Sequence, residues 1–302
     1  MNKLIRKERV AAMRPSLRIV THLIFVLVTV AMVLPLLLVV MASFSSEDSI
    51  IRKGYRLWPE IFSLEGYKIV FQYPGMLLNA YSITVMVTVM GTIISLLLTA
   101  MIAYVMARRD YAYRKATSFF VIFTMLFNGG LVPFYILVVK YLHLKDTLWV
   151  LILPYLVNPF YVLIMKGFFD RVPIEVVESA KIDGASEYRS FFTIVLPLAT
   201  PALATVGLFI SFVYWNDWWL GLLFIDNNKL VSIQLMLYRT MNSIEFFAAN
   251  ARYMSGQIDV TKFPSLTARM ALAVLGAGPM MFIFPFFQRY FVKGLTVGSI
   301  KE

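Results

Sequence analysis

The chain of 302 residues contains no cysteine and only two histidines. Without cysteine it can form neither a disulfide nor a thiolate metal site, and His22 and His143 are too distant in sequence to indicate a histidine metal site. Charge is also scarce, because charged residues make up 15% of the chain against about 25% in soluble domains. Hydrophobic residues make up 60%, and the mean hydropathy is +0.75. These values indicate an integral membrane protein.

Sequence signatures of catalysis are missing as well. No G-x-x-x-x-G-K-[ST] run occurs, so the sequence offers no phosphate-binding P-loop. The apolar segments contain no cluster of His, Asp and Glu at one membrane depth, which a membrane enzyme would need. They also lack the paired charges and the internal repeat typical of a transporter that acts alone. We therefore expect a protein that is not an enzyme and that binds neither a metal nor a cofactor itself.

Long apolar runs are what the chain has in quantity. A helix needs about 20 apolar residues to cross the hydrocarbon core of a membrane. Six segments qualify: 17–42, 81–107, 117–139, 147–165, 198–225 and 270–288. The first is longer than the core of about 7 to 15 residues usual in a signal peptide, so we expect it to be retained. The predicted fold is an all-α membrane protein with six transmembrane helices.

The distribution of Lys and Arg predicts the orientation of these helices in the membrane. With the N-terminus in the cytoplasm, the inner segments hold 17 basic residues in 73 positions and the outer segments 11 in 88. Both termini are therefore expected in the cytoplasm. The net charge of +11 is divided among short loops, which favours topology and lipid contact over nucleic-acid binding. The expected parts are a basic cytoplasmic segment 1–18, a six-helix domain 19–293 with outer loops 43–79 and 226–269, and a cytoplasmic tail 294–302.

A polar stretch lies between the fourth and fifth predicted spans, on the cytoplasmic side. Residues 178–197 read ESAKIDGASEYRSFFTIVLP. Pro173 predicts the start of a helix, and Asp183-Gly184 predicts a break, because glycine tolerates the left-handed conformation that ends a helix. We interpret 171–197 as two short helices at an angle, with small residues at the bend that permit close approach by another protein. An ordinary turn in an amphipathic loop is the alternative.

The order of residues in this stretch resembles the "EAA" signature of the membrane subunits of ABC importers. The family pattern is Glu-Ala-Ala, two residues, Asp-Gly-Ala, a spacer with an aromatic residue, and a proline that opens the next helix. The chain matches it with Glu178, Ser179, Ala180, Asp183, Gly184, Ala185, Phe191 and Pro197. Ser179 departs from the family's first alanine, a small-for-small change. Residues 215–217 (WND) and the ending QRYFVKGLTVGSIK look like the carbohydrate importers, especially the polysaccharide branch of the maltose-type group.

The resemblance implies a division of labour in a bacterial cytoplasmic membrane. The chain would form half of the channel, paired with a second homologous permease subunit. Two ATPase subunits would bind ATP and Mg²⁺, and an extracytoplasmic solute-binding protein would deliver a carbohydrate. Segment 171–197 would be the coupling helix, and its ATPase-docking residues would be Glu178, Ser179, Ala180, Asp183, Gly184 and Ala185. The alternative within the family is a permease for a non-sugar solute such as a peptide or an anion.

Candidate solute contacts lie near the end of the fifth predicted span. Residues 212–221 read FVYWNDWWLG, and aromatic faces beside Asn or Asp acceptors suit the C–H faces and hydroxyls of sugars. An acid in a span is a functional candidate, but the alternative is that these residues form an aromatic belt at the membrane interface or pack between helices. Asn158 is a further candidate; its alternatives are an interhelical hydrogen bond or cover for the carbonyl freed by Pro159. The predicted solute pathway comprises Asn158, Tyr214, Trp215, Asn216, Asp217 and Trp218.

Two further patterns concern the segments around these residues. Asn128-Gly129-Gly130 predicts an interruption of the third span, either as a flexible break that lines a cavity or as a kink for close packing. Apolar residues at helical spacing predict a helix over 232–250. We expect this helix on the outer membrane face or on the partner subunit. The resemblance implies contact with the binding protein, and plain surface packing is the alternative.

Overall fold

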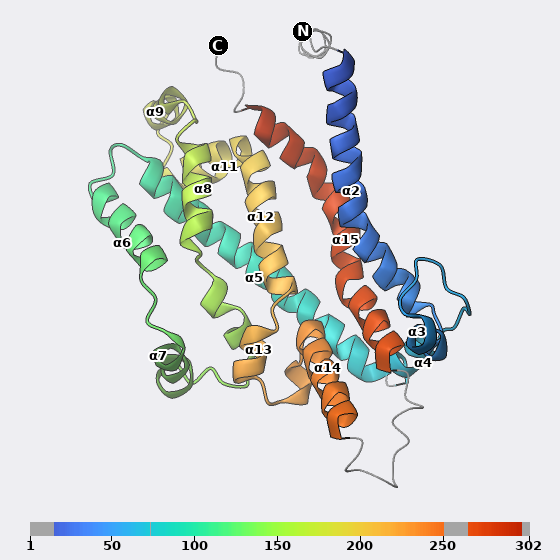
Figure 1. Cartoon of the computed structure of the whole chain (residues 1–302). Coiled ribbons are helices and arrows are strands. Elements are labelled where there is room, and N and C mark those ends of the chain that lie inside the picture. The colour runs from blue at the N-terminus through green and yellow to red at the C-terminus, as the bar shows by residue number, and fades with distance from the viewer. Residues whose placement is uncertain (1–14, 73, 251–264, 298–302) are drawn as a thin grey trace. The chain divides into compact units, whose positions relative to one another are not determined.

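The computed structural model describes residues 15–72, 74–250 and 265–297, which form helices and their connections (Figure 1). These described residues contain no β-strand, only an isolated bridge between Ser45 and Phe62. The predicted all-α class is therefore confirmed. The chain divides into two compact units, of which the first comprises residues 1–72 and 248–275 and the second residues 73–247 and 276–302. Most of the predicted basic segment 1–18 and of the tail 294–302 lies outside the described residues.

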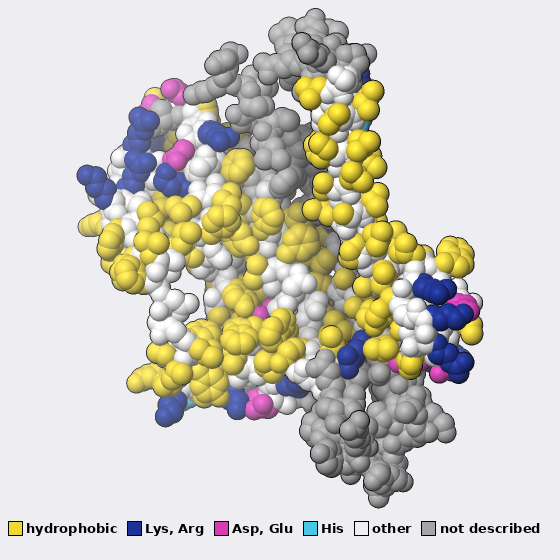
Figure 2. Space-filling view, in the orientation of Figure 1, with side chains coloured by type: hydrophobic (Ala, Val, Ile, Leu, Met, Phe, Trp, Pro, Cys, Tyr) yellow, Lys and Arg dark blue, Asp and Glu magenta, His cyan; other side chains and the backbone are white. Residues whose placement is uncertain are grey.

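In the first unit, a long apolar helix leads into two short ones: α2 (Pro15–Ser43), α3 (Glu47–Lys53) and α4 (Glu65–Val70). After Arg18, α2 carries no charged side chain, and apolar side chains surround it on all sides. Nearly all of them are exposed within this chain, and hydrophobic atoms cover the helix in Figure 2. An apolar helix without a polar face is typical of a membrane span. The first predicted span matches α2 closely.

A carboxylate ties α3 to the start of α15 (Ser265–Val297). Glu47 accepts hydrogen bonds from the backbone N–H groups of Leu266 and Thr267, both at 2.9 Å, and from the Thr267 hydroxyl at 3.0 Å. A carboxylate at this position satisfies free N–H groups and interacts favourably with the helix dipole. Gly66 of α4 approaches the same turn so closely that a Cβ there would lie 2.7 Å from the Thr267 carbonyl carbon. The first predicted outer loop therefore packs on the start of α15 at two places, around Glu47 and around Gly66.

Three helices form the centre of the second unit: α5 (Pro74–Ala107), α8 (Pro159–Phe169) and α12 (Thr200–Trp215). These three helices pack against one another, and α6 (Arg114–Leu126) packs against α5 and α8 (Figure 1). Gly91 of α5 permits the closest approach, because a Cβ there would lie 2.6 Å from the ring of Tyr214 in α12. α5 begins at Pro74 instead of residue 81, since proline is well suited to a first helical turn.

The other candidate spans within residues 74–247 are bent pairs of helical segments. The bend is 112° between 114–126 and 131–141, 52° between 148–155 and 159–169, and 84° between 187–198 and 200–215. The predicted interruption at 128–130 is confirmed, and Gly130 there has a φ of +87° that favours glycine. In the described residues, three helices are long and apolar enough to cross a membrane singly, or six if each bent pair counts as one span.

Shorter segments complete the second unit and lie mainly at the ends of the long helices. They are α7 (Leu131–Ile136), η1 (Leu137–Tyr141), η2 (Leu148–Leu151), η3 (Leu153–Tyr155), α9 (Ile174–Ile182), α10 (Glu187–Ser190), η4 (Phe191–Val195), α11 (Leu196–Leu198), α13 (Trp219–Phe224), η5 (Asn228–Leu230) and α14 (Ile233–Asn250). The helix predicted over 232–250 is confirmed by α14. Residues 251–264, which belong to the second predicted outer loop, lie outside the described residues.

Candidate functional site

The polar stretch folds as two short helices, α9 and α10, with a sharp bend between them. Gly184 has a φ of +79°, in the region that favours glycine. Its N–H donates to Lys181 O at 3.0 Å, and the N–H of Ala185 donates to Ala180 O at 2.9 Å, so the last carbonyls of α9 are satisfied. Ser186 then caps α10 by accepting from the backbone N–H of Arg189. The predicted helix, break and second helix are therefore all present.

Most of the residues predicted to dock on an ATPase are exposed in this chain. Glu178, Ser179, Asp183 and Gly184 are exposed, and Ala185 is half-buried. A Cβ at Gly184 would meet no atom within 4 Å, so the space beside the bend is open. Ala180 differs from the prediction: it is buried against the chain itself, one turn after buried Val177, because both lie on the inward face of α9.

Two apolar side chains on the same segment were not predicted as docking residues. Ile182 is 86% exposed and Tyr188 is 73% exposed, on either side of the bend. Large apolar side chains with this exposure on a polar segment indicate a contact surface for another molecule. One weak signal for Ile182 was present in the sequence, namely its position directly before the Asp-Gly break.

A network of four charged side chains fixes the bend to the C-terminal end of α5. Arg108 donates through Nη1 to Glu187 Oε2 at 3.0 Å, and through Nε and Nη2 to the two carboxylate oxygens of Asp110. Lys181 Nζ lies 2.7 Å from Glu187 Oε1 and 3.1 Å from Asp110 Oδ2. Tyr104 in α5 joins the network, because its hydroxyl accepts from Arg108 at 2.8 Å and donates to Glu187 at 3.2 Å.

Burial and charge alternation strengthen this network. The side chain of Arg108 is only 14% exposed, and each cation contacts both carboxylates. The Arg108 guanidinium, with help from Lys181, holds the pKa of Asp110 well below its ordinary value. Hydrogen bonds to Glu187 and Asp110 raise the pKa of Lys181. All four groups are therefore charged at neutral pH. Charged side chains gather over this end of the second unit in Figure 2.

The predicted solute residues on α12 turn out to have packing roles in two cases. Tyr214 and Trp215 are 3% and 4% exposed. The Tyr214 hydroxyl donates to Ile152 O at 3.0 Å, and the Trp215 indole Nε1 donates to Gly276 O at 2.9 Å. Both polar tips of these side chains are thus occupied within the chain. Their burial favours the interhelical packing alternative over direct solute contact.

The neighbouring positions end one helix and start the next. Asn216 is exposed, and its Nδ2 donates to Phe212 O at 2.9 Å. Asp217 Oδ1 accepts from the Tyr155 hydroxyl at 2.9 Å and from Leu220 N at 3.4 Å, at the beginning of α13. Trp218 stacks on Tyr238, with ring centroids 4.6 Å apart. Asp217 therefore links α13 to the segment around residue 155.

Asn158 has a local structural role that differs from both predicted alternatives. Its Oδ1 accepts from the backbone N–H of Phe160 at 2.9 Å, so it caps the start of α8. Among the described residues, the side chain bonds neither across helices nor to a carbonyl freed by Pro159. Asn158 and Tyr214 both line a small cavity of about 100 Å³.

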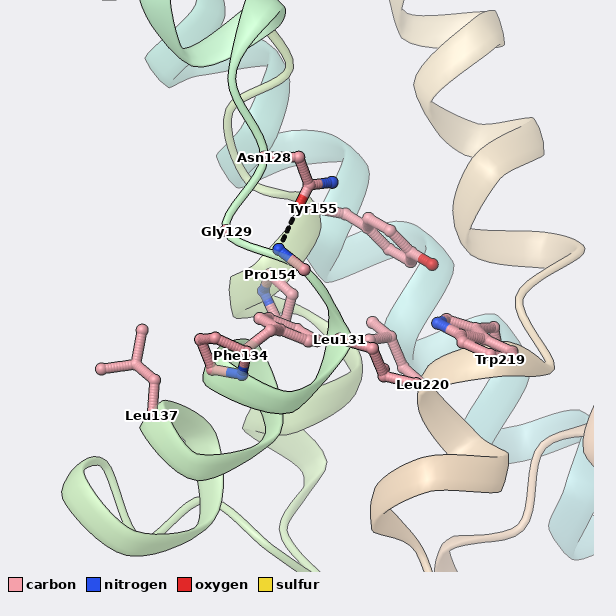
Figure 3. A pocket seen from close by; sticks show the side chains of 11 residues that line it. Asn128, Gly129, Leu131, Phe134, Leu137, Pro154, Tyr155, Trp219 and Leu220 are labelled. Carbon is pink, nitrogen blue, oxygen red and sulfur yellow. Dashed lines mark hydrogen bonds between the residues drawn. The ribbon is translucent and has the colours of Figure 1, made fainter.

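A larger cavity lies beside these residues within the second unit. It has a volume of about 670 Å³ and lies between the break in the third span, the segment 154–155 and the start of α13. Figure 3 shows the Tyr155 hydroxyl directed toward Trp219, while Asn128 accepts from Gly130 N at 2.9 Å. The residues lining it are Asn128, Gly129, Gly130, Leu131, Pro133, Phe134, Leu137, Pro154, Tyr155, Trp219 and Leu220.

Of the predicted pathway residues, none lines the larger cavity. Asp217 reaches its wall through two hydrogen bonds, one from the Tyr155 hydroxyl and one from the backbone N–H of Leu220. Trp219, 40% exposed, offers an aromatic face there; it belongs to the aromatic run that predicted sugar contact but was not among the predicted pathway residues. The signal in the sequence that did point to the cavity was the Asn-Gly-Gly break at 128–130. A cavity with aromatic, amide and phenol groups can bind a polar ligand with C–H faces.

Most of the chain matches a known protein family. Residues 98–297 match the family described as "Binding-protein-dependent transport system inner membrane component". The chain belongs to this family. It is 38% identical over 269 residues to the polygalacturonan/rhamnogalacturonan transport system permease protein YtcP of Bacillus subtilis (strain 168), covering 89% of this chain and 92% of that protein. It is 28% identical over 284 residues to the arabinooligosaccharides transport system permease protein AraQ of Halalkalibacterium halodurans, covering 92% and 94%.

A solved structure has the same fold as this inner membrane component. The crystal structure of a bacterial ABC transporter involved in the import of the acidic polysaccharide alginate superposes with a TM-score of 0.78 at 24% identity. The match covers 92% of this chain and 99% of that chain. The resemblance to ABC importer membrane subunits is thereby confirmed, and the protein is a multi-pass component of a bacterial cytoplasmic membrane. Both named relatives are permease proteins for carbohydrates, so a non-sugar solute is not favoured.

Proposed function

We propose that this chain is the membrane-spanning subunit of an ATP-driven importer and forms half of the pathway for an oligo- or polysaccharide. Two ATPase subunits hold ATP and Mg²⁺, a second homologous permease forms the other half, and an extracytoplasmic binding protein supplies the solute. Family membership and the carbohydrate names of the relatives support this assignment. The chain's own contribution is mechanical, because ATP hydrolysis takes place in partner subunits.

The observation that carries the proposal is the exposed bend at Gly184. Segment 171–197 is the coupling segment, seated on the ATPase through Glu178, Ser179, Asp183, Gly184 and Ala185, with Ile182 as an apolar contact. The open space beside Gly184 and the high exposure of Ile182 suit a groove on a partner. Ala180 supports the segment from within. When ATP closes the ATPase dimer, the bend moves with it. This movement shifts the membrane helices from an inward-facing to an outward-facing arrangement.

The topology follows from the same assignment. Six spans cross the membrane if each bent pair counts as one, and both termini lie in the cytoplasm. The excess of Lys and Arg in the inner segments supports this orientation. The coupling segment then lies in the cytoplasm and the segment 225–250 on the outer side. The domain boundaries are those expected from the sequence: segment 1–18, permease domain 19–293 and tail 294–302.

The solute pathway runs past the larger cavity. Trp219 and Tyr155 provide aromatic faces for sugar rings, and Asn128 provides an amide for hydroxyl groups. Asp217 orients Tyr155 through the 2.9 Å hydrogen bond and does not itself face the cavity. Tyr214, Trp215, Asn216 and Trp218 hold the surrounding segments, and Asn158 caps the helix beside them.

Uptake by the reconstituted complex tests the proposal. Proteoliposomes that contain the full chain, its partner permease, both ATPases and the binding protein should accumulate acidic or neutral oligosaccharides in an ATP-dependent way. Peptides and inorganic anions should not accumulate. Accumulation of a peptide instead of any oligosaccharide would show that the solute assignment is wrong.

Two glycines with a positive φ provide a pair for the docking assignment. Gly184 (φ +79°) and Gly54 (φ +74°) both follow a short helix, and a Cβ at either would meet no atom within 4 Å. Gly54 has a ψ of −175°, a region nearly confined to glycine, so valine there costs about 1–3 kcal/mol, at least as much as at Gly184. Gly184→Val should lose ATP-driven uptake while Gly54→Val retains it. Equal uptake by the two variants would contradict the docking role.

A further inference from the structure

Among the candidate spans that lie wholly within the second unit in the described residues, α5 is the one that continues without a bend. The candidate spans formed by 114–141, 148–169 and 187–215 are bent by 112°, 52° and 84°. α5 runs for 34 residues with no proline after Pro74, which corresponds to about 51 Å. A continuous helix transmits a displacement along its axis, whereas a bend can absorb it. α5 is therefore the stiffest connection between the two ends of this unit.

The inner end of α5 is fixed to the coupling segment by charge and packing. Arg108, the residue after α5, forms an ion pair with Glu187. Arg108 and Lys181 also both contact the carboxylate of Asp110. Tyr104 packs its ring against Phe191, with centroids 5.1 Å apart, and donates its hydroxyl hydrogen to Glu187. Both sides of the Gly184 bend are held, because Lys181 lies in the last turn of α9 and Glu187 begins α10. A displacement of the bend must therefore move the end of α5.

The opposite end of α5 is fixed to η5 and α14. Asn79 Nδ2 donates to Lys229 O at 3.0 Å. The Thr84 hydroxyl accepts from the backbone N–H of Ile233, the first residue of α14, at 2.8 Å, and donates to Ala80 O at 2.8 Å. Thr84 and Ile233 are 2% and 0% exposed, so no water can replace this bond. A side chain of α5 thus satisfies a buried N–H at the start of α14, where the helix itself offers no acceptor.

We propose that α5 couples the ATPase-docking bend mechanically to the η5–α14 segment, and that Arg108, Thr84 and Asn79 are the positioning residues at its two ends. The inference rests on the proposed function, in which the bend faces the ATPase and η5–α14 faces the outer side and the binding protein. Energetic coupling is reciprocal, so the same helix lets the docked binding protein change the state of the ATPase. Of these three residues, Thr84 should contribute most to the coupling, because it is buried and its hydroxyl accepts a hydrogen bond from the backbone N–H of Ile233.

The experiment measures ATPase activity of the complete complex with and without its solute-loaded binding protein. Thr84→Val keeps the side-chain shape and removes the acceptor for the Ile233 N–H. Thr88→Val is the matched control, since Thr88 is buried one turn further along α5 and its hydroxyl has no hydrogen-bond partner among the described residues. We expect Thr84→Val to keep the basal ATPase rate and to lower the stimulation by the binding protein about fivefold or more. Thr88→Val should retain the wild-type stimulation.

Two further variants keep the result decisive. Thr84→Ser retains the hydroxyl and should restore stimulation, which a purely steric role of the threonine would not predict. If Thr84→Val does not insert, Asn79→Ala, at a partly exposed bond, should lower the stimulation in the same direction. Wild-type stimulation in Thr84→Val, or in Asn79→Ala where Thr84→Val fails to insert, would overturn the inference. If the wild-type complex shows no stimulation and no ATP-driven uptake, it is the proposed function that fails.

Discussion

Replacing Gly91 with alanine tests the packing at the centre of the second unit. The added Cβ would lie 2.6–2.7 Å from three ring carbons of Tyr214, which is far inside an ordinary carbon–carbon contact. The ring would have to retreat by roughly 1 Å. It is not free to do so, because Tyr214 is buried and its hydroxyl donates to Ile152 O at 3.0 Å.

The magnitude follows from two opposing terms. Overpacking of this kind costs about 1–3 kcal/mol, while replacing glycine by alanine inside a helix returns about 0.5–1 kcal/mol. The net destabilisation of about 1–2 kcal/mol should lower the melting temperature by about 2–8 °C. Gly207→Ala should have a smaller effect, since its nearest atom is the flexible tip of Leu96 at 3.2 Å. Gly167→Ala, with no atom within 4 Å, should be neutral or slightly stabilising.

Thermal unfolding of the three detergent-solubilised variants, followed by the loss of the monodisperse peak on size-exclusion chromatography, provides the assay. The expected order of stability is Gly167→Ala, then Gly207→Ala, then Gly91→Ala. A Gly91→Ala protein as stable as Gly167→Ala would refute the close contact between α5 and α12.

Three further predictions concern the other contacts. Glu47→Ala removes three hydrogen bonds at the start of α15 and should cost about 1–3 kcal/mol, seen as a lower melting temperature. The melting-temperature loss caused by Arg108→Gln should stay constant from pH 8 to 5 and shrink below about pH 4, because a depressed pKa makes the Asp110 contribution complete above its unfolded value and lost on acidification. Trp219→Ala should raise the half-saturating oligosaccharide concentration for uptake, whereas Trp215→Phe should lower stability and leave that concentration unchanged.

Much of the helical architecture could be predicted from local sequence. The apolar run of α2 defines its own length, because no Lys, Arg, Asp or Glu interrupts it between Arg18 and Ser43. The break at Gly184 was predictable since Asp-Gly after a helix needs a left-handed residue, and the φ of +79° agrees. The helix α14 followed from apolar residues at helical spacing. In each case the prediction depends only on residues close together in the sequence or on one face of a single helix.

The bends were only partly predictable. The Asn-Gly-Gly break in the third span was evident, but the 84° bend before α12 was not, although Pro197 and Pro201 flank it. Proline in a membrane helix is compatible with either a kink or a straight span, and neighbouring helices decide between them.

The candidate site shows more clearly what local sequence cannot predict. An aromatic run at the end of a helix does not reveal which side chains face the core, so Trp215 appeared equivalent to Trp219. The structure buries the first on Gly276 and leaves the second beside the cavity. The Arg108–Glu187 pair spans 79 positions in the sequence and could not be inferred from local pattern.

Single-cysteine labelling tests the central claim most directly, because the chain contains no cysteine of its own. Glu178→Cys places a thiol on the exposed face of α9, and Asn228→Cys, on the exposed surface of η5, serves as the control. A membrane-impermeant maleimide should label Glu178→Cys only in inside-out vesicles, and bound ATPase subunits should protect it. Asn228→Cys should react only in right-side-out vesicles. Labelling of Glu178→Cys from the outside, or labelling that bound ATPase subunits leave unchanged, would contradict the account.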